Sequence, residues 1–353
     1  MRLAIPDGVS GPVLVTFRTT RPGGAPLEAA PAFWGDPCLE WSRSLLGLAR
    51  IARANVRQVG WRGAVSKFVD YTGHDEERAR FRRWVELNTS SAAALAEMAS
   101  AVEGLAHQPL ISIITPVYNT DPQWLVACIE SVRRQAYPNW ELCLADDAST
   151  SAETEAVLKR YAGDTKIKIV RLDRNQHISA ASNAALACAT GEFVAMLDHD
   201  DELSPDALFE VVKCLNDNPT ADFVYSDEDK IDTAGERCEP YFKPDWSPEM
   251  FRSFMYTNHL MVLRRSVVDA AGGFRVGFEG SQDYDLALRV IERTDRVVHV
   301  PKVLYHWRKI PGSAAAEVEA KPWALKAARR ALEEHLRRTG VDAQVVPGML
   351  TGL

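Results

Sequence analysis

The chain has 353 residues, of which 46% are hydrophobic and 25% are charged, and its formal net charge is -7 at pH 7. This is the composition of a folded globular protein, which excludes a mainly disordered or collagen-like chain. The acidic balance argues against a general nucleic-acid binder, and the basic run of residues 78–83 is interpreted as a solvated helix face.

The six cysteines are scattered and form no Cys-x-x-Cys pair of the kind that holds zinc or acts as a redox motif, so we expect reduced thiols. No apolar run approaches the roughly 20 residues that span a bilayer. The N-terminus also lacks the basic region and apolar core of a secretory signal. We therefore expect a cytoplasmic protein, with peripheral association at the inner face of the cell membrane as the alternative, and no nucleic-acid partner.

Residues 1–108 are expected to form an N-terminal, mainly helical extension that serves as a cap or docking element. Residues 14–17 could form a short strand, and the Gly/Pro-rich residues 21–31 a loop. Apolar residues then recur at helical spacing from about residue 76 to residue 105. No catalytic constellation is found in this part of the chain.

From residue 109 onward, apolar strand-length runs alternate with amphipathic helical segments. The expected strands are 110–115, 140–145, 167–170, 193–197, 223–226, 297–300 and 303–305, and the expected helices are 122–134, 152–161, 179–189, one opened by residues 204–206, 283–292 and 322–338. Alternation of this kind predicts an α/β fold whose mixed, mainly parallel sheet carries helices on both faces.

The apolar residues 193–197 end in three carboxylates, Asp198, Asp200 and Asp201. Such a run predicts a buried parallel strand that delivers charge to the carboxyl edge of the sheet, where open α/β folds bind their ligands. Neighbouring carboxylates at a buried edge repel one another unless a cation offsets their charge. The alternative is a solvated loop followed by a helix cap, and the position at a strand end favours a site for Mg²⁺ or Mn²⁺ with a diphosphate.

Asp146 and Ser149 close the second expected strand. A carboxylate there can accept the imide hydrogen of uracil or thymine, and Ser149 can cap the next helix. Capping explains the serine and leaves Asp146 unexplained.

Asp283 lies at the start of an expected helix. A carboxylate near a helix N-terminus is stabilised by the helix dipole, so Asp283 could be a first-turn stabiliser. If its side chain faces a cleft, it could be a general base. The local sequence leaves both interpretations open.

Residues 306–308 follow an apolar strand. His306 could bind a metal or phosphate, Trp307 could stack on a sugar, and Arg308 could neutralise a phosphate. A core histidine beside a surface arginine is the alternative, and the tripeptide alone favours it.

Taken together, residues 109–312 resemble the family 2 glycosyltransferases, which have the glycosyltransferase-A fold, a Rossmann-like α/β architecture. The resemblance rests on several motifs that occur in the family's order, namely residues 111–119, 145–149, 173–183, 197–201, 225–229, 280–285 and 304–308. The last three motifs are similar to those of bacterial transferases that build O-antigen, capsule or other cell-surface polysaccharide.

The resemblance implies a role for each matching residue. It places Asp146 against the pyrimidine, Asp198 near the ribose or sugar, Asp200 at the metal and diphosphate, and Asp283 as the catalytic base. The implied nucleotide-sugar contacts are Pro116, Tyr118, Asn119, Asp146, Asn175, Ser179, Asn183, Asp198 and Arg308; His306 joins Asp200 as a metal ligand, and Asp201, Gln282 and Trp307 lie on the acceptor side.

Three features depart from the family pattern. Gln282 precedes Asp283 where the family commonly has glutamate, which removes one charge and leaves the implied base. His177 stands where glycine is frequent, so the loop over the nucleotide is expected to have a different shape. Related chains often continue into a second transferase unit, whereas this sequence ends at residue 353.

The resemblance implies an inverting glycosyltransferase that uses Mn²⁺ or Mg²⁺ and a UDP- or dTDP-sugar, with a glycan or lipid-linked saccharide as acceptor. It implies a catalytic domain at residues 109–342, with a nucleotide-sugar half (109–230), an acceptor half (231–312), a closing helix (313–342) and a tail (343–353). A nucleotidyltransferase would carry a Gly-rich basic loop, which residues 115–119 lack. A non-catalytic scaffold or carbohydrate-binding subunit is the second alternative, and the intact acids argue against it.

Overall fold

The computed structural model describes residues 77–310 and 322–346. The first four strands alternate with helices, in the order β1 (Ile111–Val117), α3 (Pro122–Arg133), β2 (Trp140–Asp146), α4 (Ala152–Tyr161), β3 (Ile167–Arg171), α5 (His177–Cys188) and β4 (Phe193–Met196). Each of these elements lies within about two residues of its expected position. The alternating pattern was therefore sufficient to locate this half of the fold.

The second half is less regular. It contains β5 (Glu202–Leu203), α6 (Ala207–Asp217), β6 (Phe223–Ile231), β7 (Arg237–Tyr241), α7 (Pro248–Phe251), β8 (Met261–Arg264), α8 (Arg265–Ala271), α9 (Gln282–Ile291), β9 (Val297–Arg308) and α10 (Pro322–Thr339). The sequence did not predict β5, β7, β8, α7 or α8. The two short strands expected at 297–300 and 303–305 are one long strand, β9, whose register against β6 shifts near Ser226 and Asp227.

In the described part of the chain, the strands form one sheet in the order β3-β2-β1-β4-β8-β6-β9-β5, and β7 pairs with β6. The strands β1 to β4 are mutually parallel, β8 runs antiparallel to β4 and to β6, and β9 runs parallel to β6. The prediction of a mixed, mainly parallel sheet with helices on both faces is confirmed. The order β2-β1-β4 brings the carboxyl ends of three consecutive parallel strands to one edge.

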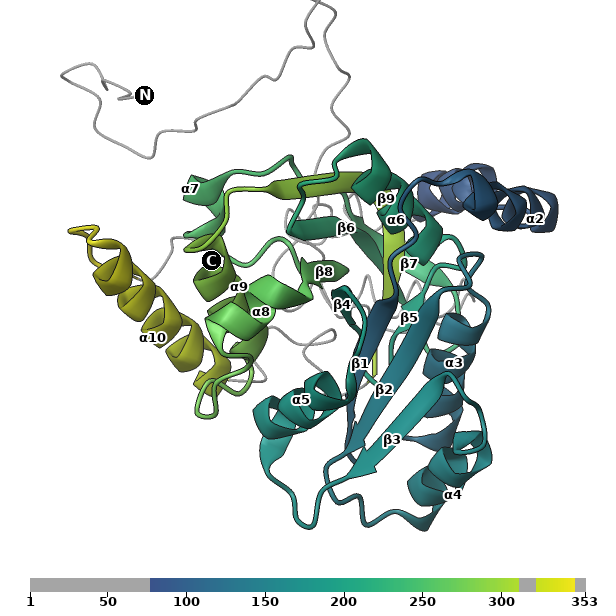
Figure 1. The fold of residues 1–353 in the computed structure, drawn as a ribbon, viewed down its shortest axis with the longest axis horizontal. Coiled ribbons are helices and arrows are strands. Elements are labelled where there is room, and N and C mark those ends of the chain that lie inside the picture. Colours follow the sequence, from purple (N-terminus) through teal and green to yellow (C-terminus); the bar gives the residue numbers. More distant parts are fainter. Residues whose placement is uncertain (1–76, 311–321, 347–353) are drawn as a thin grey trace, which may run out of the picture. The chain divides into compact units, whose positions relative to one another are not determined.

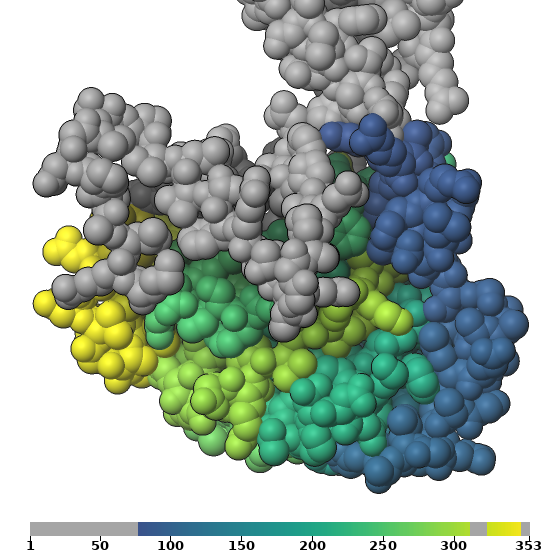
Figure 2. Space-filling model, turned by 90° about the horizontal axis from the view of Figure 1, so that it is seen from above, coloured from purple at the N-terminus to yellow at the C-terminus, as the bar shows by residue number. Residues whose placement is uncertain are grey.

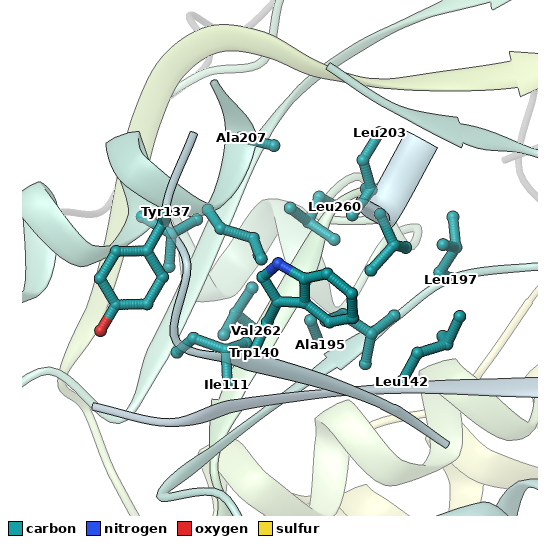
Figure 3. Close-up of a cluster of buried hydrophobic side chains, with 14 of the residues drawn as sticks. Ile111, Tyr137, Trp140, Leu142, Ala195, Leu197, Leu203, Ala207, Leu260 and Val262 are labelled. Atoms are coloured by element: carbon teal, nitrogen blue, oxygen red, sulfur yellow. The ribbon is translucent and has the colours of Figure 1, made fainter. Parts of the chain in front are cut away.

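The helices cover the two faces of the sheet because side chains alternate along each strand. Ile113 of β1 belongs to a core cluster that includes side chains of α3, α4 and α6, whereas its neighbour Ile114 belongs to a second cluster that includes side chains of α5, α9 and α10. Figure 1 shows α3 and α4 on one side of β1 to β3 and α5 on the other. Figure 3 shows the core on the α3 side, where the Trp140 indole lies among the side chains Ile111, Ala195, Leu197 and Val262.

The expected helix at 76–105 is two helices with a break. Residues 77–88 are helical, and α2 (Ala92–Ala101) starts anew at Ser91, whose hydroxyl accepts a hydrogen bond from Ala94 N (3.2 Å). The first helix packs Trp84 edge-on against Phe242 (5.2 Å between ring centroids), and these helices form one edge of the face shown in Figure 2. The strand and loop expected within residues 14–31 lie outside the described residues. No described helix has the length and apolar character needed to cross a membrane.

Local sequence sets the helix starts. Asp121 caps α3 by accepting from Gln123 N (2.9 Å) with Pro122 in the first turn, as is typical of helix N-termini. The helix expected to open at residues 204–206 begins instead at Ala207. The Ser204 hydroxyl bonds to the Asp206 carboxylate, which holds these residues in a turn before the helix.

Candidate active site

A cleft lies at the carboxyl edge of the sheet, where β1 and β4 end. It is lined by Ile114, Pro116, Ile178, Ser182, Met196, Leu197, Asp198, Asn258, His259, Phe274, Gln282 and Asp283. The residues Pro116, Asp198, Gln282 and Asp283 were singled out from the sequence. The structure therefore brings residues 198–201 after β4, here called the acid turn, and the N-terminus of α9 to one cleft. The two segments are more than 80 residues apart in the chain.

The acid turn contains two accessible carboxylates and one buried one. The side chain of Asp198 is 44% exposed and that of Asp200 is 22% exposed. Asp201 is fully buried, where its carboxylate accepts hydrogen bonds from Arg308 N (2.7 Å) and from the Tyr305 hydroxyl. Burial, followed by repulsion from Asp200 and Asp198, raises the pKa of Asp201 well above its ordinary value. Asp201 thus anchors the turn from beneath, while Asp198 and Asp200 remain available to a ligand.

The side chains of residues 306–308 are held by protein partners. Arg308 is 2% exposed; its Nε donates to Asp200 O (2.7 Å), its Nη2 pairs with Glu202, and its guanidinium lies 4.1 Å from the Trp124 ring centroid. His306 is 9% exposed, and its Nδ1 lies 2.5 Å from Asp229 Oδ1. In this geometry Arg308 holds the acid turn, His306 is paired with Asp229 of β6, and neither residue is among those that line the cleft. Their assignments to phosphate and metal remain predictions.

The proposed pyrimidine contact is already engaged within the protein. Asp146 is 1% exposed; its Oδ1 accepts from Ser149 N (2.9 Å), and its Oδ2 lies 2.9 Å from Arg171 Nη1. The side chain of Arg171 in this pair is half exposed. The contact of Asp146 with a pyrimidine remains a prediction. The side chain of Asn119 accepts from Thr150 N (2.8 Å) and Ser151 N (3.0 Å), which ties the end of β1 to the loop after β2.

The remaining predicted nucleotide contacts lie in or beside these loops. Tyr118 is 43% exposed, Asn175 accepts from His177 N (3.3 Å), and Ser179 is buried in α5. Asn183 exchanges two hydrogen bonds with the backbone of Phe274 (2.8 Å each), so it holds the loop that lines the cleft. Its amide is thereby used for structure in the described conformation.

Asp283 occupies the other side of the cleft, in the first turn of α9. Its Oδ1 accepts from Tyr284 N (2.8 Å), and its Oδ2 accepts from the Asn258 amide. Burial raises the pKa of Asp283, and the nearby His259 opposes this effect. A carboxylate whose pKa is raised towards neutrality is a better proton acceptor than an ordinary aspartate, which suits a general base.

Asn258 and His259 line the cleft and were missed from the sequence. They precede an apolar run, residues 260–263, whose last three residues lie in β8. Polar residues beside an apolar run were the signal that revealed Asp198. That signal was not applied here because residues 231–260 are rich in aromatics and show no regular period.

The carboxylate oxygens of the acid turn suit a divalent cation whose remaining ligands come from a bound phosphate and water. No group of three or more His, Cys, Asp and Glu side chains among the described residues is placed to hold a metal by itself. Mg²⁺ is commonly held by one or two carboxylates, with phosphate oxygens and water as the other ligands. The partly exposed Asp200 supplies an oxygen donor of this kind.

The fold and cleft define an α/β protein of the glycosyltransferase-A type, and its comparison with known proteins agrees. The family model described as Glycosyl transferase family 2 matches residues 112–272. The putative glycosyltransferase EpsE of Bacillus subtilis is 30% identical over 206 residues, which cover 57% of this chain and 73% of EpsE. This chain belongs to glycosyl transferase family 2.

Longer relatives match more strongly. The uncharacterized protein y4gI of Sinorhizobium fredii is 51% identical over 271 residues (76% of this chain, 30% of y4gI). The O-antigen biosynthesis protein RfbC of Myxococcus xanthus is 39% identical over 246 residues (69% of this chain, 19% of RfbC). The chain thus spans less than a third of the length of these two relatives. The fold is similar to that of residues 1–349 of S. aureus TarS in complex with UDP-GlcNAc (TM-score 0.53, 19% identity, 67% of this chain and 68% of the TarS 1–349 chain).

Proposed function

We propose that this chain is an inverting glycosyltransferase that transfers a sugar from a UDP- or dTDP-sugar to a hydroxyl of a cell-surface glycan or lipid-linked saccharide, with Mn²⁺ or Mg²⁺. The observation that carries the proposal is the cleft in which Asp198, from the acid turn, faces Asp283 at the start of α9. A leaving group and a proton acceptor must lie on opposite sides of the anomeric carbon in a single displacement. The cleft provides acids on both sides.

In the proposed reaction, Asp283 accepts the proton of the acceptor hydroxyl. The hydroxyl oxygen attacks the anomeric carbon, the bond from that carbon to the diphosphate breaks, and the nucleoside diphosphate leaves with the bonding electrons. One displacement inverts the configuration at the anomeric carbon. The hydrogen bonds from Tyr284 N and Asn258 fix the Asp283 carboxylate, so that its orientation is set before the acceptor arrives.

Asp200 would bind the divalent cation, which when bound offsets the charge that develops on the departing diphosphate. The backbone of the same turn is held by Arg308 and Asp201. This arrangement fixes the position of Asp200 without using its carboxylate.

Two similarities support the choice of substrates. TarS, which shares the fold, is described in complex with UDP and with UDP-GlcNAc, which is in keeping with a UDP-sugar donor. RfbC is named as an O-antigen biosynthesis protein, which is in keeping with a surface polysaccharide as the product.

The test is Asp283→Asn. This substitution keeps the size of the side chain and one acceptor oxygen for Tyr284 N, while its new NH2 group can pair with Asn258 only if the Asn258 amide turns over. It removes the basicity of the side chain, so transfer should fall by about 10²–10⁴-fold while the affinity for the donor stays nearly unchanged. Product formation by mass spectrometry and donor binding by calorimetry measure the two effects. Asp217→Asn, an exposed acid on α6, is the matched control. Wild-type transfer by Asp283→Asn would remove Asp283 from the base role.

A further inference from the structure

The imidazole of His259 is held rigidly at the cleft. Its backbone N donates to Glu228 Oε2 (2.7 Å), and its Nδ1 lies 2.9 Å from the same oxygen. One face of the ring stacks on Tyr305, with 4.5 Å between centroids and 16° between planes. The side chain is 15% exposed. Because Glu228 engages the Nδ1 side, the orientation of the Nε2 side is fixed as well.

The Nε2 side faces the acids of the cleft. It lies 4.0 Å from Asp198 Oδ2, on the turn after β4. The preceding residue, Asn258, donates its amide to Asp283 on the opposite side. Two consecutive residues therefore contact the two carboxylates that the proposed reaction requires. His259 places its imidazole near Asp198, and Asn258 donates a hydrogen bond to Asp283.

The acidic side chains around the His259 ring favour its protonated form. Burial alone lowers the pKa of His259, but the hydrogen bond and charge of Glu228, followed by the charges of Asp198 and Asp201, outweigh it and raise this pKa to about 9. Burial likewise tends to raise the pKa of Glu228, but the Lys243 ammonium, 4.0 Å away, and His259 lower it. Glu228 is thus ionised and His259 is an imidazolium at neutral pH.

Burial and two charged groups, one from each of two loops at the cleft, act on the pKa of Asp283. Burial in α9 raises its pKa, His259 before β8 lowers it, and Asp198 after β4 raises it again. His259 is therefore the cation that opposes both burial and Asp198. Without it, the Asp283 carboxylate would be protonated to a higher pH.

We infer that His259, fixed by Glu228, is a positioning residue for transfer: its imidazolium supplies a permanent positive charge to the cleft that Asp198 and Asp283 share. This inference rests on the proposed function, because it assigns a purpose to the charge of Asp283. The charge orients Asp198 on the donor side and keeps Asp283 ready to accept a proton.

The experiment compares His259→Asn with His299→Asn in the full 353-residue chain. Asparagine retains a donor towards Glu228 and removes the cation. His299 is the matched control: it pairs with the adjacent acid Asp227 (2.9 Å) and stacks on Tyr225 (4.7 Å between centroids), yet it does not line the cleft. Both variants lose a stacked histidine that pairs with an acid of β6, and only His259→Asn loses a residue that lines the cleft.

The readout is the pH profile of kcat/KM. In His259→Asn we expect the acid limb of the profile, where activity rises with pH, to move up by about one pH unit, since a higher pKa of Asp283 leaves less base at a given pH. At pH values on that limb, kcat/KM should fall by up to about tenfold. His299→Asn should keep the wild-type acid limb even if it lowers stability. An acid limb in His259→Asn that coincides with that of His299→Asn would overturn the inference.

A second measurement does not depend on catalysis. The NMR resonance of the His259 ring in the wild-type chain should titrate near pH 9, and in Glu228→Gln it should titrate at lower pH; titration of the wild-type ring below pH 7 would also overturn the inference. If the wild-type chain transfers no sugar, the proposed function fails. If it transfers normally and the His259→Asn limb does not move, only the role of His259 fails.

Discussion

At the scale of single residues, the acid turn separates anchoring from binding. Asp201 and Arg308 are buried and use their polar groups in hydrogen bonds that hold the turn. The carboxylates of Asp198 and Asp200 are partly exposed to solvent. Side chains that are fully engaged within the protein reorganise little when a ligand binds, which lowers the entropic cost of binding. We therefore expect ligand contacts from the exposed pair and stability from the buried pair.

Asp200→Ala should weaken metal-dependent binding of a nucleotide sugar at least about tenfold, which corresponds to about 1.4 kcal/mol. The reason is that the substitution removes an oxygen donor to the cation and leaves the anchors of the turn in place. Calorimetry with UDP-sugar and Mn²⁺, with and without EDTA, measures the effect, and Asp217→Ala serves as the control. Equal affinity of Asp200→Ala and the wild type in Mn²⁺ would reject the metal assignment.

Long-range pairs explain which parts of the site the sequence could predict. Asp198 and Asp283 were identified because each follows or starts an element with a clear period. His259 was not identified, since its significance depends on Glu228, Tyr305 and Asp198, which lie on other elements. The sequence separates Glu228 from its partner by 31 residues, and no local pattern indicates that pairing.

At the scale of elements, the sequence predicted the strands and helices whose burial gives a clear apolar pattern, and it missed those whose burial does not. β1 and β2 are buried at every position, so their apolar runs are unmistakable. β8 has only four residues and passes directly into α8, while β7 is half-buried throughout. Such short or half-buried antiparallel strands are specified by their neighbours in the sheet and leave little trace in the sequence.

The entry into β4 gives a test of packing at this scale. A Cβ on Gly191 would lie 2.5 Å from Leu110 O and 2.7 Å from Ser112 Oγ, which leaves no space for a side chain beside β1. We expect Gly191→Ala to lower the free energy of unfolding by about 1–3 kcal/mol, because the backbone must shift. Urea denaturation measures the change.

The matched control for that test is Gly163→Ala, in the turn after α4, where an added Cβ would meet no atom within 4 Å. It should change the free energy of unfolding by less than about 0.5 kcal/mol. Equal effects of the two substitutions would contradict the close approach of β1 and β4 at Gly191.

At the scale of the whole catalytic body, a buried ion network ties α9, which carries Asp283, to its surroundings. Asp285 is fully buried and accepts hydrogen bonds from Arg275 Nε (3.0 Å) and Arg289 Nη2 (2.7 Å). Arg275 also pairs with Glu334 of α10 (2.6 Å). The position of the proposed base thus depends on α10 and on the loop before α9, in addition to its own helix.

Asp285→Ala should therefore destabilise the protein by about 3–5 kcal/mol, because it leaves two arginines without their buried counter-charge. Glu334→Ala removes a partly exposed partner of Arg275 and should cost less than about 1 kcal/mol. Urea unfolding followed by tryptophan fluorescence compares the two. A loss in Asp285→Ala no larger than that in Glu334→Ala would mean that α9 is held by apolar packing alone, since the charges would then contribute nothing to its placement.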